Sequence, residues 1–198
     1  MDENIDLNQE LQKKNQEMLS NKKKVDLDTS MESLLVFFDN YCNNISSEIN
    51  NRICEYHGIN ADSEKGKIFH NTITSFLFIA NKELENIIKK TLDKIKEKLD
   101  SLDDKEYALL LNRASIVIIN ELTDYYATNI NMLSSELNQD VSEEVKNKID
   151  KFLFDFITIR IINVLKDKFM YTITVIGNNF EENKEIIDNI NEKTIQKN

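Results

Sequence analysis

The sequence predicts an all-α protein, an antiparallel up-down bundle of four long helices with a polar N-terminal arm and a short C-terminal helix. Three observations carry this prediction. The 198 residues include no proline and three glycines, so the residues that interrupt helices and build turns are almost missing. Four long segments place apolar residues at steps of three and four, the spacing of one helix face. The connections between these segments are short, and short loops make successive helices antiparallel neighbours.

The first helix is predicted from about Met31 to His57. A capping-box pattern at Thr29 and Glu32 favours a start there, and Gly58 favours an end after His57. The apolar face of this segment consists of Met31, Leu35, Phe38, Cys42, Ile45, Ile49, Ile53 and Tyr56.

The second helix is predicted from either Asp62 or Lys67 to Leu99, and its start is left open because Gly66 lies between the two positions. Its last turns, KKTLDKIKEKLD, carry opposite charges at helical spacing, which is typical of a solvated helix end. The apolar face consists of Phe69, Ile73, Phe76, Leu77, Leu84, Ile88, Leu92, Ile95 and Leu99.

The third helix is predicted over about 104–137, because Asp103 and Glu106 suit an N-terminal cap. Its apolar side consists of Leu111, Ala114, Ile118, Leu122, Tyr125 and Leu133. The fourth helix is predicted over about 142–176, and Ser142 is its expected cap.

The predicted bundle ends at a helix stop at Gly177. The chain therefore has three predicted parts, one before the bundle, the bundle itself and one after it. The polar N-terminal arm is expected to be helical or mobile, and a short amphipathic helix with a tail follows the bundle. The arm, the bundle and the C-terminal part are predicted at residues 1–28, 29–177 and 178–198.

The most apolar stretch is FLFDFITIRIINVL, at 152–165. A membrane span is disfavoured, because Asp155 and Arg160 interrupt the stretch, Lys166 follows it, and each charge costs about 2.5–3.5 kcal/mol at a bilayer centre. Paired strands are an alternative, since Ile, Thr and Val are abundant, but the apolar residues do not alternate cleanly. On a helical wheel they cover about half of the circumference. This predicts a helix inside the bundle, or between the bundle and a second subunit.

The formal net charge of −10 argues against a nucleic-acid-binding protein. The N-terminus has no apolar segment of a secretory signal, so the cytoplasm is the expected location. The excess of Ile, Asn and Lys indicates an AT-rich genome. Cys42 and Cys54 lie twelve residues apart in one predicted helix, about 18 Å, and are therefore expected to be free thiols.

No catalytic motif is found, so the chain is expected not to be an enzyme and to hold no cofactor or metal. A di-iron bundle needs two Glu-x-x-His motifs, and neither His57 nor His70 has a glutamate three residues before it. Cys54 and His57 lie one helical turn apart, but two ligands do not make a zinc site, so a structural thiol is favoured. Phosphate-binding loops need more glycines than the chain supplies.

A cluster of carboxylates lies in EENKEIID, residues 181–188. Glu181, Glu182, Glu185 and Asp188 recur there at helical spacing. This stretch resembles the magnesium-binding carboxylates of all-α nucleotide pyrophosphohydrolases, and the resemblance implies magnesium-dependent nucleotide hydrolysis. It covers eight residues, and the second acidic motif that those enzymes carry on a later helix is missing. The other interpretation is an acidic first turn on a surface helix.

Arg160, one of three arginines, is expected to have a structural role. Successive antiparallel helices bring it level with Glu121 of the third helix, which is itself level with Glu83 of the second. A half-buried guanidinium needs such carboxylate partners, and its planar fork suits them. A ligand-binding role for Arg160 is the alternative.

The function expected from these observations is that of a non-enzymatic structural or interaction protein. It would act by self-association, most simply as a dimer, or by binding a protein partner. An amphipathic lipid- or membrane-associated protein is the first alternative, and the magnesium-dependent hydrolase is the second. The expected interface consists of Phe154, Ile157, Ile161, Leu165, Phe169, Phe180, Ile187 and Ile190.

Overall fold

The computed structural model describes residues 2–176, with the backbone alone for 2–12, 100 and 104. It confirms the all-α bundle, and no strand occurs among these residues. The elements in chain order are α1 (Asp2–His57), α2 (Glu64–Lys96), the 3-10 turn η1 (Leu99–Ser101), α3 (Asp104–Leu137), α4 (Glu143–Leu153) and the π-helical segment η2 (Phe154–Ile161), after which an α-helix continues over 162–176. Within this range no helix is both long and apolar enough to cross a membrane.

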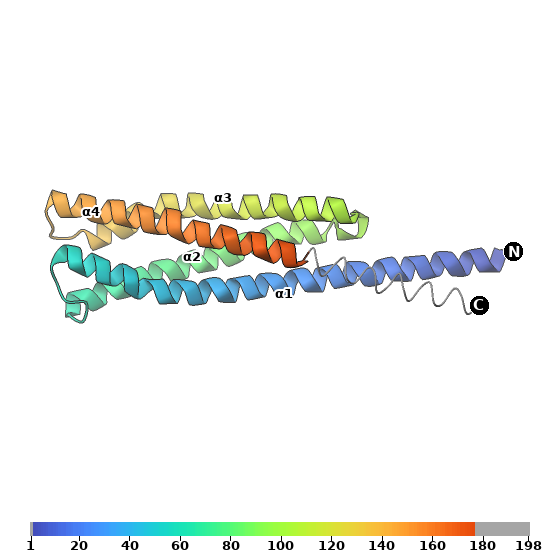
Figure 1. Ribbon diagram of the computed structural model, residues 1–198, viewed down its shortest axis with the longest axis horizontal. Helices are drawn as coiled ribbons and strands as arrows, with labels where there is room; N and C mark the ends of the chain where they lie inside the picture. Colours follow the sequence, from blue (N-terminus) through green and yellow to red (C-terminus); the bar gives the residue numbers. More distant parts are fainter. Residues whose placement is uncertain (1, 177–198) are drawn as a thin grey trace.

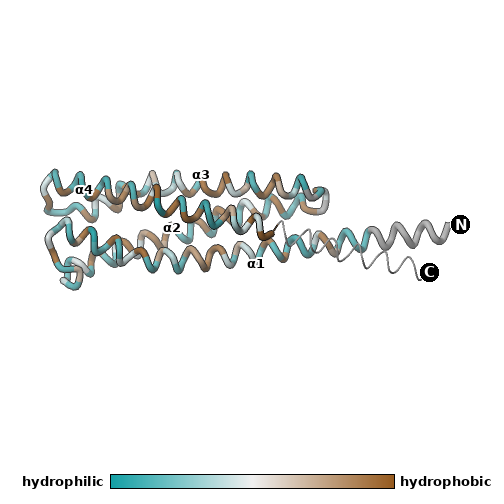
Figure 2. Tube along the Cα trace, in the orientation of Figure 1, coloured by the Kyte–Doolittle hydropathy of each residue, from teal (hydrophilic) through white to brown (hydrophobic). Residues whose placement is uncertain are grey.

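The helices run up and down in turn, as predicted (Figure 1). α1 packs on α2, α2 packs on α3, and the fourth helix packs on both α3 and α1. The N-terminal part of α1 extends beyond the other helices (Figure 1). Hydrophobic and hydrophilic residues alternate along each helix, so each one buries a single stripe (Figure 2).

The helix ends follow local capping chemistry. Asp103 accepts a hydrogen bond from the Glu106 N–H at 2.8 Å, while the Glu106 carboxylate accepts one from the Asp103 N–H, so α3 begins with a capping box. Ser142 caps α4 by accepting from the Val145 N–H. Ser63 caps α2 in the same way. The two caps predicted from the sequence, Asp103 and Ser142, are confirmed.

The turn after α1 is a Schellman motif. Gly58 has a φ of 65°, which a glycine adopts without steric cost, and it donates to the Glu55 carbonyl. The Ile59 N–H reaches back to the Cys54 carbonyl at 3.0 Å. Gly66 is needed for a different reason, because a Cβ there would collide with the Ala61 carbonyl.

The predicted start of the first helix at Thr29 is wrong. α1 is continuous through this position, where the Ser33 hydroxyl donates to the Thr29 carbonyl as it does inside a helix. Leu27 is fully buried, so the core extends into the segment expected to be a separate arm. The physical reason is that no glycine or proline interrupts residues 2–57, and a cap residue in mid-sequence does not by itself end a helix.

The fourth helix is not α-helical throughout, because η2 interrupts it. Buried apolar residues recur there at every fourth position: Ile149, Leu153, Ile157, Ile161, Leu165, Phe169 and Ile173. In an ideal α-helix each step of four rotates the side chain by about 40°, or about 240° over the six steps. A π-helix has wider turns, so it takes up part of this drift and keeps the stripe facing the core.

This burial corrects the predicted interface. Ile157, Ile161, Leu165 and Phe169 are covered by the other helices of the same chain, so they are not available to a partner. The apolar arc is wide because the fourth helix has neighbours on two sides, α1 and α3. Phe154 is half exposed. The remaining positions of that surface (Phe180, Ile187 and Ile190), the stop at Gly177 and the carboxylates of 181–188 lie outside the described residues.

Candidate functional site

The outward side of α2 exposes a group of large apolar side chains. Ile68, Phe78 and Ile79 each keep between 56% and 58% of their surface exposed. They lie opposite the buried residues of the same helix, together with the small polar residues Asn71 and Ser75 between them. We call these five residues the α2 outer face. The run FLFIA at 76–80 explains the exposure of Phe78 and Ile79, since five consecutive apolar residues on a helix cannot all face the core.

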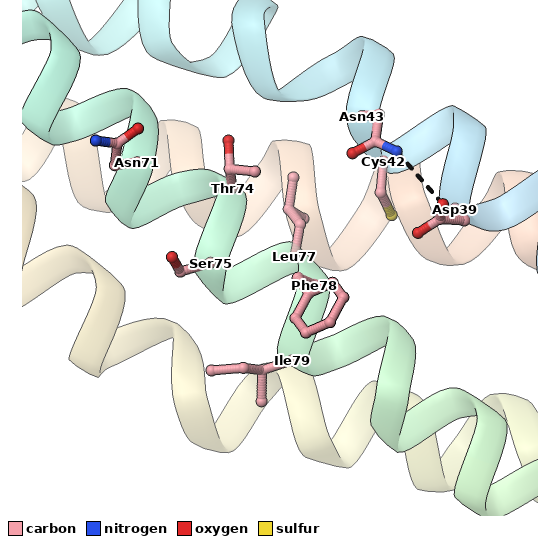
Figure 3. A pocket seen from close by; sticks show the side chains of 9 residues that line it. All are labelled: Asp39, Cys42, Asn43, Asn71, Thr74, Ser75, Leu77, Phe78 and Ile79. Atoms are coloured by element: carbon pink, nitrogen blue, oxygen red, sulfur yellow. Dashed lines mark hydrogen bonds between the residues drawn. The ribbon is translucent and has the colours of Figure 1, made fainter.

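A hollow of about 450 Å³ lies on the α1 side of this face. Asn71, Ser75, Phe78 and Ile79 all contribute to its lining, together with Thr74, Leu77 and three residues of α1 (Figure 3). Asp39 of α1 forms its polar edge. Its carboxylate accepts hydrogen bonds from Asn43 at 3.4 Å and from Asn81 of α2 at 3.0 Å, so it links the two helices.

A second hollow, of about 550 Å³, lies on the α3 side. Ile68 and Ile79 form one wall, and Tyr125, Met132 and Leu133 of α3 form the other. Met132 is itself well exposed. The α2 outer face is therefore a ridge with a shallow apolar hollow along each flank.

The thiol of Cys42 lines the first hollow, but its surroundings do not favour chemistry. Burial, reinforced by the carboxylate of Asp39, raises the pKa of the Cys42 thiol to about 12. The thiol is therefore protonated at neutral pH and is a poor nucleophile. Cys42 and Cys54 are both free and buried, which confirms the prediction of free thiols.

Cys54 and His57 each have a hydrogen-bond partner elsewhere in the chain. Cys54 donates from its Sγ to Asn50 Oδ1 at 3.7 Å. His57 Nε2 lies 2.6 Å from the Leu137 carbonyl at the end of α3, and burial lowers the His57 pKa. Across the described part of the chain, no group of three or more His, Cys, Asp or Glu side chains is placed to hold a metal ion.

The predicted partners of Arg160 are wrong. Its guanidinium lies 2.6 Å from Glu48 of α1, with neither Glu121 nor Glu83 as its partner. Arg160 also lies over the Phe156 ring, 4.5 Å from the centroid. The antiparallel order of the helices gives the height of a residue along the bundle, but not which neighbouring helix it faces.

The exposure of the Arg160 pair also differs from the expected half-buried cluster. The side chains of Arg160 and Glu48 are 46% and 53% exposed, so the pair lies on the surface. The hydrogen bond from Arg160 to Glu48 raises the Arg160 pKa further. A shallow polar hollow adjoins the pair and is also lined by Arg52. Both arginines form ion pairs within the chain, Arg160 with Glu48 and Arg52 with Glu55. Its charges are satisfied within the chain, which does not favour a ligand site.

The α2 outer face was not predicted from the sequence. The predicted apolar face of this helix leaves out Ile68, Phe78 and Ile79 and gives them no role, although Phe78 and Ile79 fall on the side opposite to Ile73 and Leu84 on a helical wheel. That opposition was the signal in the sequence. Comparisons with the models of protein families, with curated proteins and with solved structures found no match for this chain.

Proposed function

We propose that the protein is a non-enzymatic helical protein that acts by binding another protein surface, either a second copy of itself or a partner. The α2 outer face is the binding surface in this proposal. The observation that carries it is the exposure of Phe78 and Ile79 side by side on α2, with Ile68 about 15 Å before them on the same side of the helix. Single exposed apolar residues are ordinary on protein surfaces, but several large ones on one side of a helix are typical of an interaction site.

The flanking hollows support the same proposal. A helix of a partner that packs on α2 would place its side chains into the two hollows, which are lined by Phe78 on one flank and by Met132 on the other. This is the ridge-and-groove arrangement by which helices pack. The polar rim, with Asp39 and Glu136, would surround the apolar centre, as in most protein interfaces.

The cytoplasmic location expected from the sequence is part of this proposal. Both cysteines of the chain are free thiols, which is the usual form of cysteine in a reducing compartment. The acidic net charge favours a protein partner over an anionic lipid surface.

A photo-crosslinking amino acid placed at Phe78 in the producing cells tests the proposal. Ile116 of α3, which is also 58% exposed, is the matched control position. The proposal predicts a covalent product at Phe78, identified by mass spectrometry as a second copy of the chain or as one defined protein, with much less product at Ile116. Products only with lipid, or equal yields at both positions, would contradict it.

A further inference from the structure

We infer that the α2 outer face binds a second copy of the chain, with the two α2 helices antiparallel across a two-fold axis near Ser75. This inference rests on the proposed function, because it names the partner of the same surface. A two-fold interface uses the same patch on both subunits, so the patch must be complementary to itself. The residues of α2 on either side of Ser75 meet this requirement in shape and in charge.

The shape argument concerns the centre of the face. A two-fold axis at Ser75 reverses the helix direction and keeps each lateral side. Three residues after Ser75 lies Phe78, and four residues before it, on the same side of the wheel, lies Asn71. Phe78 of one copy therefore faces Asn71 of the other. On the opposite side Ile79 faces Thr72 in the same way, so each large apolar side chain meets a smaller one.

Ser75 itself lies on the axis and faces its own copy. Its small side chain lets the two helices approach at the 8–10 Å that is about usual for packed helices. A large residue at this position would separate the helices and leave Phe78 and Ile79 without contacts. The exposure of Ser75 in the chain leaves this approach open.

The charge argument concerns the ends of the face. Lys65 and Lys67 lie ten and eight residues before Ser75, and Glu83 and Glu85 lie eight and ten residues after it. These positions are about 12–15 Å from the axis at 1.5 Å per residue. On the helical wheel Lys65 shares one side with Glu83, and Lys67 shares the other side with Glu85, each about 80° from Ser75.

An antiparallel pair therefore brings opposite charges together four times. Glu83 of each copy meets Lys65 of the other, and Glu85 meets Lys67. A parallel pair would place Lys65 of each copy beside Lys67 of the other, which is repulsive. Within the chain Glu85 already pairs with Lys82 at 2.9 Å, and Asn86 donates to Glu83. Both contacts are at the surface and leave the carboxylates open to a second partner.

Charge exchange between copies tests the inference. In a homodimer of the double variant Lys65→Glu, Lys67→Glu, four carboxylates meet at each end of the interface. In a homodimer of Glu83→Lys, Glu85→Lys, four ammonium groups meet at each end. Each variant alone should self-associate roughly tenfold or more weakly than the wild type in sedimentation velocity. An equimolar mixture should recover a heterodimer near the wild-type affinity, because every contact then joins opposite charges. The fourfold variant should recover a homodimer for the same reason.

The position of the axis has its own test. Ser75→Cys should be joined to its copy by a short bismaleimide in high yield, because the two residues meet on the axis. Asn120→Cys, at an exposed position of α3, is the control and should give little product. The native thiols are buried and should not react. Circular dichroism of each variant should match the wild type, since these positions are exposed or, at Lys65 and Glu83, only partly buried.

The outcomes separate this inference from the proposed function. Failure of the charge-exchanged mixture to associate, or equal cross-linking at positions 75 and 120, would overturn the antiparallel self-association. A photo-crosslink from Phe78 to a different protein would overturn it too, but would leave the proposed function in place. No protein product at Phe78 would contradict both.

Discussion

Arg160 Nη1 on η2 lies 2.6 Å from Glu48 Oε1 on α1, so one surface ion pair joins the π-helical segment to the first helix. Because both side chains are about half exposed, water screens the pair and its contribution to stability is small. Arg160→Met with Glu48→Gln, measured as a double-mutant cycle by urea unfolding, should give a coupling of about 0.2–1 kcal/mol.

Glu121→Ala is the control for this cycle. Glu121 is exposed and is not the partner of Arg160, so its substitution should change the free energy of unfolding by less than about 0.5 kcal/mol. A coupling of several kcal/mol between Arg160 and Glu121 would restore the buried cluster that the sequence predicts.

Tyr126 is fully buried, and among the described residues its hydroxyl has no hydrogen-bond partner from the protein. Burial also raises its pKa well above 10. A buried hydroxyl without a partner costs about 1–3 kcal/mol. Tyr126→Phe should therefore unfold at the same or a higher urea concentration than the wild type.

Tyr126→Ala is the matched comparison, because it removes the ring as well. It should lose about 3–5 kcal/mol, the usual cost of a large core cavity. If Tyr126→Phe were as damaging as Tyr126→Ala, the hydroxyl would have an essential partner and the account of this part of the core would be wrong.

Much of the bundle is predictable from sequence, because its signals are local. The α3 bounds, the cap at Asp103 and the turn at Gly58 follow from side chains that act within one helical turn. The start of α1 is not predictable in this way. Thr29 and Glu32 form a cap pattern, but the burial of Leu27 and the lack of a helix breaker outweigh it.

The errors at the candidate site share a physical cause, the rotation of each helix about its axis. An antiparallel topology sets the height of Arg160 along the bundle, but the turn widening in η2 sets the neighbour that it faces. The repeat of apolar residues at every fourth position can be read from the sequence, and it indicates the wider turns of η2. Phe78 lies opposite Ile73 and Leu84 on the helical wheel, so its exposure could be read from the sequence.

Cys42 predicts a dependence of stability on alkaline pH. Its pKa is raised from 9.0 to about 12 in the folded chain, so between these values the unfolded state loses a proton that the folded state keeps. The stability associated with the buried neutral thiol is complete below pH 9 and falls as pH rises toward 12. Cys42→Ala should therefore show a shallower fall in unfolding free energy over this range than the wild type.

Cys54→Ala is the control for this measurement. Burial raises the Cys54 pKa as well, but by less than that of Cys42, so its removal should change the slope less. A wild type and a Cys42→Ala variant with identical slopes, determined by urea unfolding at several alkaline pH values, would show that the thiol is not held in its neutral form.

The central claim is that the α2 outer face mediates association. The most direct test is the mass in solution of Phe78→Ser, Ile79→Ser beside the wild type and the control variant Leu109→Ser, Ile116→Ser, whose residues are about equally exposed on α3. We expect sedimentation equilibrium to give a dimer at high micromolar concentration for the wild type and the α3 control, and a monomer for the α2 variant. A dimer that survives the α2 substitutions, or a wild type that stays monomeric throughout, would contradict association of the chain with itself through this face.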